Sequence, residues 1–143
     1  MNVTFNQIIT EFNNFATKHK GISSFESKLL TEFTANNYTF PLMWVQTDSI
    51  KFKDDQVLFD FKVTFVSLLR NKDNENKILS DTLKLCSDFF SYYNDDEELY
   101  GFLMSDEAPA KQVLYKFDDS VIGNEILVTI EVKNERDSNQ VPI

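Results

Sequence analysis

The sequence predicts an α+β fold in which two main helices pack on an antiparallel β-sheet, in the order helix, strand hairpin, helix, strand pair. Two stretches, 5–16 and 78–93, place apolar residues at helical spacing, and the stretch 57–66 alternates as a strand does. The chain has 143 residues, 42% of them hydrophobic, and 14 phenylalanines, which suffices for a core without disulfides. We therefore expect one domain over residues 1–133 and a flexible tail or assembly arm over 134–143.

The first helix is expected to begin after Thr4. Thr4 and Gln7 have the spacing of a capping box, Gly21 is a suitable stop, and His19 lies near the expected C-terminal end. We interpret His19 as a helix-end residue, not a catalytic one. The apolar stripe consists of Phe5, Ile8, Ile9, Phe12, Phe15 and Ala16.

Residues 22–40 have no clean period and predict a short strand followed by a helical turn. After Pro41, the segments LMWVQT and SIKFKDDQVLFDFKVTFVSLL predict a hairpin that turns at Asp54 and Asp55. The second arm alternates an apolar face with a face that carries Asp60, Lys62 and Thr64 at its middle. We expect this second face to meet water or another subunit, so these three residues are candidate interface residues.

The second helix is expected to end near Asn94. Drawn as a wheel, its apolar arc comprises Leu85, Ile78, Phe89, Thr82, Tyr93, Cys86, Leu79, Phe90 and Leu83. Cys86 lies in the middle of that arc, which favours a buried and inert thiol over a nucleophile. Asp81 and Asp88 fall on the opposite, solvated side, with Lys84 between them.

The run Asp95, Asp96, Glu97, Glu98 follows this helix. It lacks the ligand spacing of a calcium loop, so a solvated turn or a contact for a basic partner is the better interpretation.

The segments VLYKF and EILVTIEV predict a final strand pair around DDSVIGN, where Gly123 could supply a special backbone angle. The segment NERDSNQVPI has too little apolar content to pack alone, so it is either frayed or ordered on a neighbour. We take four of its residues as candidate interface residues: Asn134, Arg136, Val141 and Ile143.

Composition excludes several classes of function. A net charge of −9 opposes binding to nucleic acid, and no segment is apolar enough to span a membrane. One His and one Cys do not make a usual zinc site, and three glycines leave no phosphate loop. We expect no enzyme activity, no metal and no cofactor.

Four segments carry a resemblance to a known group of proteins: FNNFATKHK, YTFPLMWV, LSDTLKLCSDF and DDSVIGNEI. In this order the chain resembles the neck-ring and tail-completion proteins of tailed bacteriophages, most of all those of crAss-like phages of Bacteroides. The resemblance implies a structural, tail-terminator-like virion protein, made in the host cytoplasm, that forms a homo-oligomeric ring in the head-to-tail connector. Its implied partners are copies of itself and neighbouring portal, neck or tail proteins, with DNA only passing through the lumen.

Two other hypotheses stay open. The first is a small acidic phage protein that inhibits a host nucleic-acid enzyme by imitating the charge of DNA. The second is an enzyme with an acidic or cysteine centre, which would require a reactive Cys86.

Overall fold

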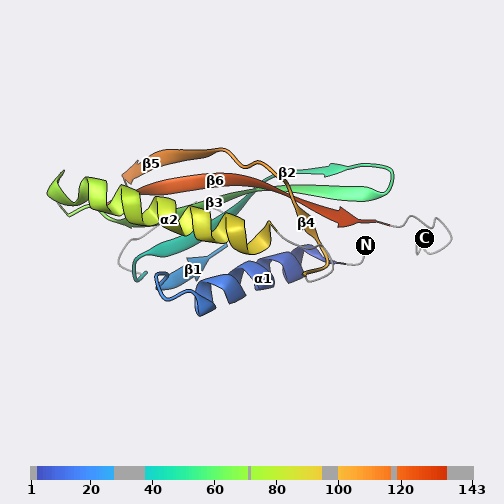
Figure 1. Cartoon of the computed structure of the whole chain (residues 1–143), viewed down its shortest axis with the longest axis horizontal. Coiled ribbons are helices and arrows are strands. Elements are labelled where there is room, and N and C mark those ends of the chain that lie inside the picture. Colours follow the sequence, from blue (N-terminus) through green and yellow to red (C-terminus); the bar gives the residue numbers. More distant parts are fainter. Residues whose placement is uncertain (1–2, 28–37, 71, 95–99, 117–118, 135–143) are drawn as a thin grey trace.

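The computed structural model describes residues 3–27, 38–70, 72–94, 100–116 and 119–134. These residues form two α-helices and six strands, and Figure 1 shows the helices lying along one elongated sheet. In chain order, the elements are α1 (Phe5–Lys18), β1 (Ser24–Glu26), β2 (Leu42–Phe52), β3 (Gln56–Leu68), the short 3₁₀ turn η2 (Lys72–Asn74), α2 (Glu75–Tyr93), β4 (Leu103–Met104), β5 (Ala110–Lys116) and β6 (Ser120–Lys133).

The predicted fold class, two helices on an antiparallel sheet made of a hairpin and a strand pair, is wrong. The fold is dominated by strands, which hold 44% of the described residues against 32% in helices, and its sheet is curled, six-stranded and mixed. The path runs β1-β2-β3-β6-β4, β5 also pairs with β6, and β1 runs parallel to β2. The sequence missed this because β1 and β4 are too short to show a period and their partners lie far along the chain.

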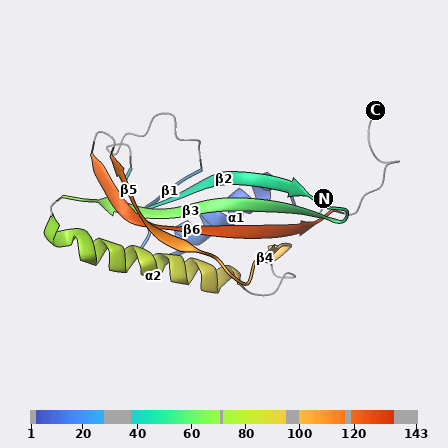
Figure 2. The ribbon, with the colours of Figure 1, turned by 90° about the horizontal axis from the view of Figure 1, so that it is seen from above.

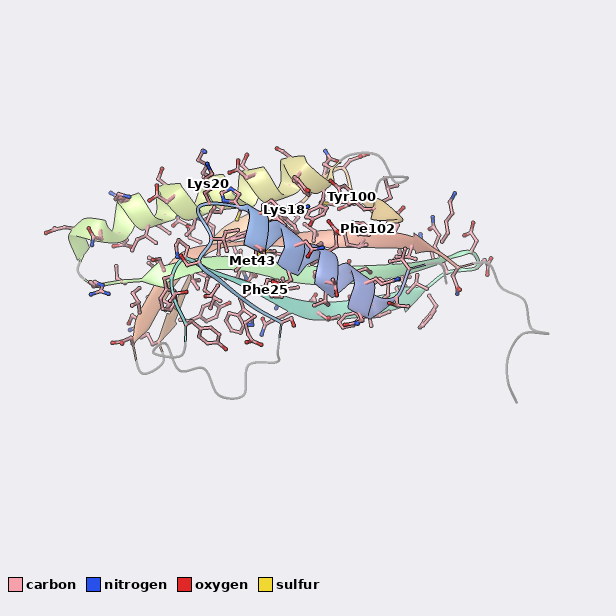
Figure 3. The ribbon with its side chains drawn as sticks, turned by 90° about the horizontal axis from the view of Figure 1, so that it is seen from below. Lys18, Lys20, Phe25, Met43, Tyr100 and Phe102 are labelled. Atoms are coloured by element: carbon pink, nitrogen blue, oxygen red, sulfur yellow. The ribbon has the colours of Figure 1, made fainter. Side chains whose placement is uncertain are left out.

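Both helices lie on one face of the sheet, as Figures 2 and 3 show from above and below. Phe12 of α1 is fully buried and meets Phe61 of β3, Phe89 of α2 and Phe102 through edge-to-face ring contacts, with centroids 5.2–6.4 Å apart. The opposite face carries a smaller apolar cluster at one end: Leu42, Trp44, Val66 and Val121. The remainder of that second face carries mostly polar side chains and holds the candidate site.

The boundaries of α1 confirm the prediction from its sequence. The side chain of Thr4 accepts a hydrogen bond from the backbone N–H of Gln7, whose side chain accepts one from the N–H of Thr4, as a capping box requires. The helix ends at Lys18, with His19 as its C-cap.

In α2 the predicted apolar arc is confirmed at its centre and wrong at one margin. Leu83, at the edge of the arc, is 53% exposed, so the buried stripe is narrower than the predicted arc. The end of the helix at Tyr93, capped by Asn94, agrees with the sequence. The buried residues are Thr82, Leu85, Cys86, Phe89 and Tyr93.

The predicted hairpin is present, with Lys53, Asp54 and Asp55 between its arms. The N–H of Lys53 donates to the carbonyl oxygen of Gln56 at 2.9 Å and closes the turn. A β-bulge between Thr47 and Ser49 bends the first arm. The short strand expected within residues 22–40 is β1, and the helical turn expected after it falls mainly on residues 28–37, outside the described residues.

Gly123 does not lie in a turn, as the sequence suggested, but inside β6 opposite Val66. A Cβ atom built on Gly123 would lie 1.8 Å from the carbonyl oxygen of Phe65. The residue must therefore be glycine because the backbones of β3 and β6 approach each other too closely for a side chain.

Candidate assembly surface

The three interface residues expected on the second hairpin arm all lie on the sheet face opposite the helices. The register of β3 and β6 pairs each with a residue of β6 on the same face: Asp60 with Thr129, Lys62 with Leu127, and Thr64 with Glu125. Sequence periodicity placed the three together, but it could not name their cross-strand partners.

Asp60 and Lys62 are half-buried and already have partners in their own subunit. The Asp60 carboxylate accepts hydrogen bonds from the hydroxyl of Thr129 at 2.6 Å and from that of Ser49 at 2.7 Å. The ammonium of Lys62 lies 3.5 Å from the carboxylate of Asp48. A partner at this surface would meet side chains that already have partners within the subunit, among them Lys62 in a half-exposed ion pair.

Thr64 is only 1% exposed, so its contacts lie inside the subunit. Its hydroxyl lies 3.4 Å from Oε2 of Glu125, and the Tyr115 hydroxyl donates to the same oxygen at 3.1 Å. The ammonium of Lys111 lies 3.8 Å from the other oxygen, Oε1. The Glu125 side chain is 7% exposed, which makes it a buried carboxylate with partners on two neighbouring strands, β3 and β5.

Sequence reasoning did not single out Glu125. The signal was weak but present, because Glu125, Thr129 and Glu131 alternate with the buried Ile126, Val128 and Ile130. What the sequence could not show is that β5 folds over this position and removes the carboxylate from water.

Burial raises the pKa of Tyr115 to about 12, and the negative charge of Glu125 and the hydrogen bond to it add to the shift. A phenol whose pKa is raised by folding stabilises the protein fully below its unfolded pKa of 10.0 and loses that contribution as the pH rises toward 12. Burial also raises the pKa of Tyr93.

We therefore expect stability to fall as the pH rises above about 10. Urea unfolding between pH 8 and 11.5 measures this, with Tyr115→Phe as the comparison. The variant should lose less stability over that range than the natural chain. Parallel curves for the two proteins would show that Tyr115 does not titrate as described.

A cavity of about 180 Å³ opens beside Glu125. Pro109, Ala110 and Leu127 supply apolar walls, and Lys62 and Lys111 stand at its margin. The cavity is smaller than the roughly 300–1,000 Å³ of small-molecule sites, so its size suits a single side chain.

The helix-side face carries an exposed apolar patch at the hairpin end, which we call the hairpin patch: Phe5, Ile50 and Phe52. Ile50 lies opposite Phe59 in the ladder, and the ring of Phe5 lies 6.1 Å from that of Phe59. Ile50 is 48% exposed and Phe52 is 68% exposed. Figure 1 shows this end of the hairpin reaching beyond the first turn of α1.

The sheet also presents two different outer edges. β1 pairs only with the stretch 42–44 of β2, and no described strand pairs with the outer edge of β2 from Val45 to Phe52. On the other side of the sheet, β5 pairs with β6, and no second described strand pairs with β5. Edge strands are templates for pairing with another chain unless charges or bulges guard them. The outer edge of β2 has both the bulge and the exposed Lys51, and it also exposes the apolar side chains of Ile50 and Phe52.

The remaining predicted interface residues are mostly outside the described residues. This applies to Asp95, Asp96, Glu97 and Glu98 after α2, and to Arg136, Val141 and Ile143 near the C-terminus. Asn134 is described and half-buried, and its N–H donates to the carbonyl oxygen of Asp55 at 2.7 Å. The segment after β6 therefore starts at the tip of the hairpin.

His19 joins the end of α1 to α2. Its Nε2 lies 2.9 Å from the carboxylate of Asp88, while its Nδ1 accepts the N–H of Gly21 at 2.9 Å. In the neutral ring the proton therefore sits on Nε2 and is donated to Asp88. This arrangement fits a residue that fastens a helix end.

Cys86 is buried in the main hydrophobic core, as its place on the wheel predicted. Burial raises the pKa of its thiol to about 12, which suppresses the reactive thiolate at neutral pH. We expect a mild thiol reagent at pH 8 to label the native protein on the order of a thousandfold more slowly than the urea-unfolded protein. Equal labelling rates in the native and unfolded states would support the hypothesis of an enzyme with a cysteine centre.

Among the described residues, no three His, Cys, Asp or Glu side chains gather as metal ligands would. No described helix combines the length and apolar character required to cross a membrane. No protein-family model matches the chain, and no curated protein sequence is significantly similar to it. The function must therefore be argued from the geometry of this surface and from the sequence resemblance.

Proposed function

We propose that this chain is a structural, ring-forming subunit of a bacteriophage neck, acting in head-to-tail connection or tail completion. The observation that carries the proposal is the hairpin end of the sheet, where Ile50 and Phe52 are exposed on the length of β2 whose outer edge no described strand covers. Large apolar side chains next to an open strand edge favour addition of another chain.

The two margins of the sheet are unlike surfaces, which a head-to-tail ring would bring together. A two-fold dimer uses the same patch on both subunits, whereas the margins formed by β2 and β5 are different surfaces. A head-to-tail contact between unlike surfaces closes into a ring when its rotation allows. The acidic net charge of −9 supports a lumen through which DNA passes without being held.

The rival proposal, an acidic inhibitor that imitates DNA, finds less support in the arrangement of charges. Asp48, Asp81, Asp88 and Glu125 each lie within 4.0 Å of a basic side chain. Such pairing leaves these carboxylates poor substitutes for a row of phosphates.

Mass spectrometry of purified virions of the encoding phage tests the proposal. We expect this chain in intact particles and in isolated neck or tail assemblies, at a fixed ratio to the portal protein. A chain that is abundant in the infected cell but absent from particles would refute a structural role and favour the inhibitor.

A further inference from the structure

The buried carboxylate of Glu125 has two unlike oxygens. Oε2 accepts hydrogen bonds from Tyr115 and Thr64, whereas Oε1 meets only the ammonium of Lys111, at 3.8 Å, among the described residues. That distance is too long for a hydrogen bond. Glu125 and Lys111 both line the 180 Å³ cavity. A carboxylate that lines a cavity and keeps one oxygen without a hydrogen bond from the described residues favours a donor there, best a cationic one.

The margin of the cavity sets a pattern of charge. Glu125 lies between two lysines. Lys111 is its direct neighbour on β5, and Lys62 lies on β3 opposite Leu127, two residues further along β6. An occupant that complements this surface carries a cation with an acid on either side. The apolar walls suit the methylene stem of a long side chain.

The chain contains this pattern in its segment 134–143, where Arg136 stands between Glu135 and Asp137. Arginine has a fork of donors that matches a carboxylate and a stem that packs on apolar surface. We propose that the cavity beside Glu125 is a socket for the guanidinium of Arg136 from a second copy of this chain. The choice of a second copy as partner rests on the self-assembly proposed above.

Length excludes the same subunit as the source of the arginine. Asn134 is fixed at the hairpin tip by its bond to Asp55, and the cavity begins at Leu127, seven residues or about 23 Å back along β6. Arg136 lies two residues beyond Asn134, which gives about 7 Å of backbone and a side chain of similar length. The guanidinium therefore falls short of its own cavity, and a neighbour must supply it.

A peptide of residues 134–143, added to the full chain carrying Arg136→Gln, tests the socket directly. Trp44 reports occupancy by fluorescence, since it is the only tryptophan and its ring lies 5.7 Å from that of Tyr115. We expect the natural peptide to bind, and a peptide carrying Arg136→Gln to bind at least about tenfold more weakly. Binding should also weaken at high salt.

Two further changes in the full chain locate the site. Adding Glu125→Gln should weaken binding by about tenfold or more, and adding Lys111→Met, a change at an exposed residue, by about two- to fivefold. Asp81→Asn is the matched control, because it also removes one negative charge but lies on α2 and does not line the cavity. It should leave the affinity unchanged.

Equal affinity of the natural peptide and the peptide carrying Arg136→Gln would overturn the socket. So would full affinity in the Lys111→Met chain, a result that stands even if the Glu125 variant folds poorly. This test can be separated from the test of the proposed function. If the peptide binds but virions do not contain the chain, only the neck role is refuted. If virions contain the chain but the chain does not bind the peptide, only the socket is refuted.

Discussion

Gly123→Ala should lower the free energy of unfolding by more than about 4 kcal/mol. A Cβ at this position would lie 1.8 Å from the carbonyl oxygen of Phe65 and 2.9 Å from the Cα of Val66, so it meets backbone and not a flexible side chain. Relief would require β3 and β6 to separate at the centre of the sheet, where both faces are packed.

The control for this prediction is Gly21→Ala. Its added Cβ would lie 3.1 Å from the ring of His19 and 3.3 Å from Cδ2 of Leu85, and side-chain shifts of a few tenths of an ångström relieve such contacts. We expect that variant to stay within about 1 kcal/mol of the natural chain. Thermal unfolding followed by circular dichroism compares the two. A Gly123→Ala protein that melts within about 3 °C of the natural chain, about 1 kcal/mol, would contradict the backbone approach described here.

The second large effect concerns assembly. Replacing Ile50 and Phe52 together by serine should raise the dissociation constant between subunits by about a hundredfold or more, because each buried apolar side chain contributes about 1.5–3 kcal/mol. The subunit itself should keep its melting temperature, since both side chains are exposed in it. Light scattering coupled to size-exclusion chromatography measures the effect.

Leu83→Ser provides the matched control for the hairpin patch. Leu83 is an exposed apolar residue of similar size, 53% exposed, but it lies on α2 and away from the hairpin. We expect this variant to assemble as the natural chain does. If Leu83→Ser disrupts assembly and the hairpin variant does not, the contact runs through α2.

Local features of this fold could be predicted from the sequence, and long-range ones could not. The capping box of Thr4 and Gln7, the turn at Asp54 and Asp55 and the buried side of α2 depend on residues close in the chain, so short patterns reveal them. The parallel pairing of β1 with β2 joins Phe25 to Met43 across a long connection and leaves no local signal.

In the candidate site, too, the local features could be predicted from the sequence and the long-range ones could not. Alternation put Asp60, Lys62 and Thr64 on one face, but only the register of β3, β6 and β5 brings Thr64, Lys111 and Tyr115 around Glu125. Gly123 is a related case, because a glycine inside a strand and a glycine in a turn look alike until the neighbouring strand is known.

Negative-stain electron microscopy of the purified full chain tests the central claim, assembly into a ring, most directly. We expect closed rings of uniform diameter with a central opening, lost in the Ile50→Ser, Phe52→Ser variant and kept in Leu83→Ser. Uniform particles of a single 16.7 kDa subunit at every concentration would contradict the claim.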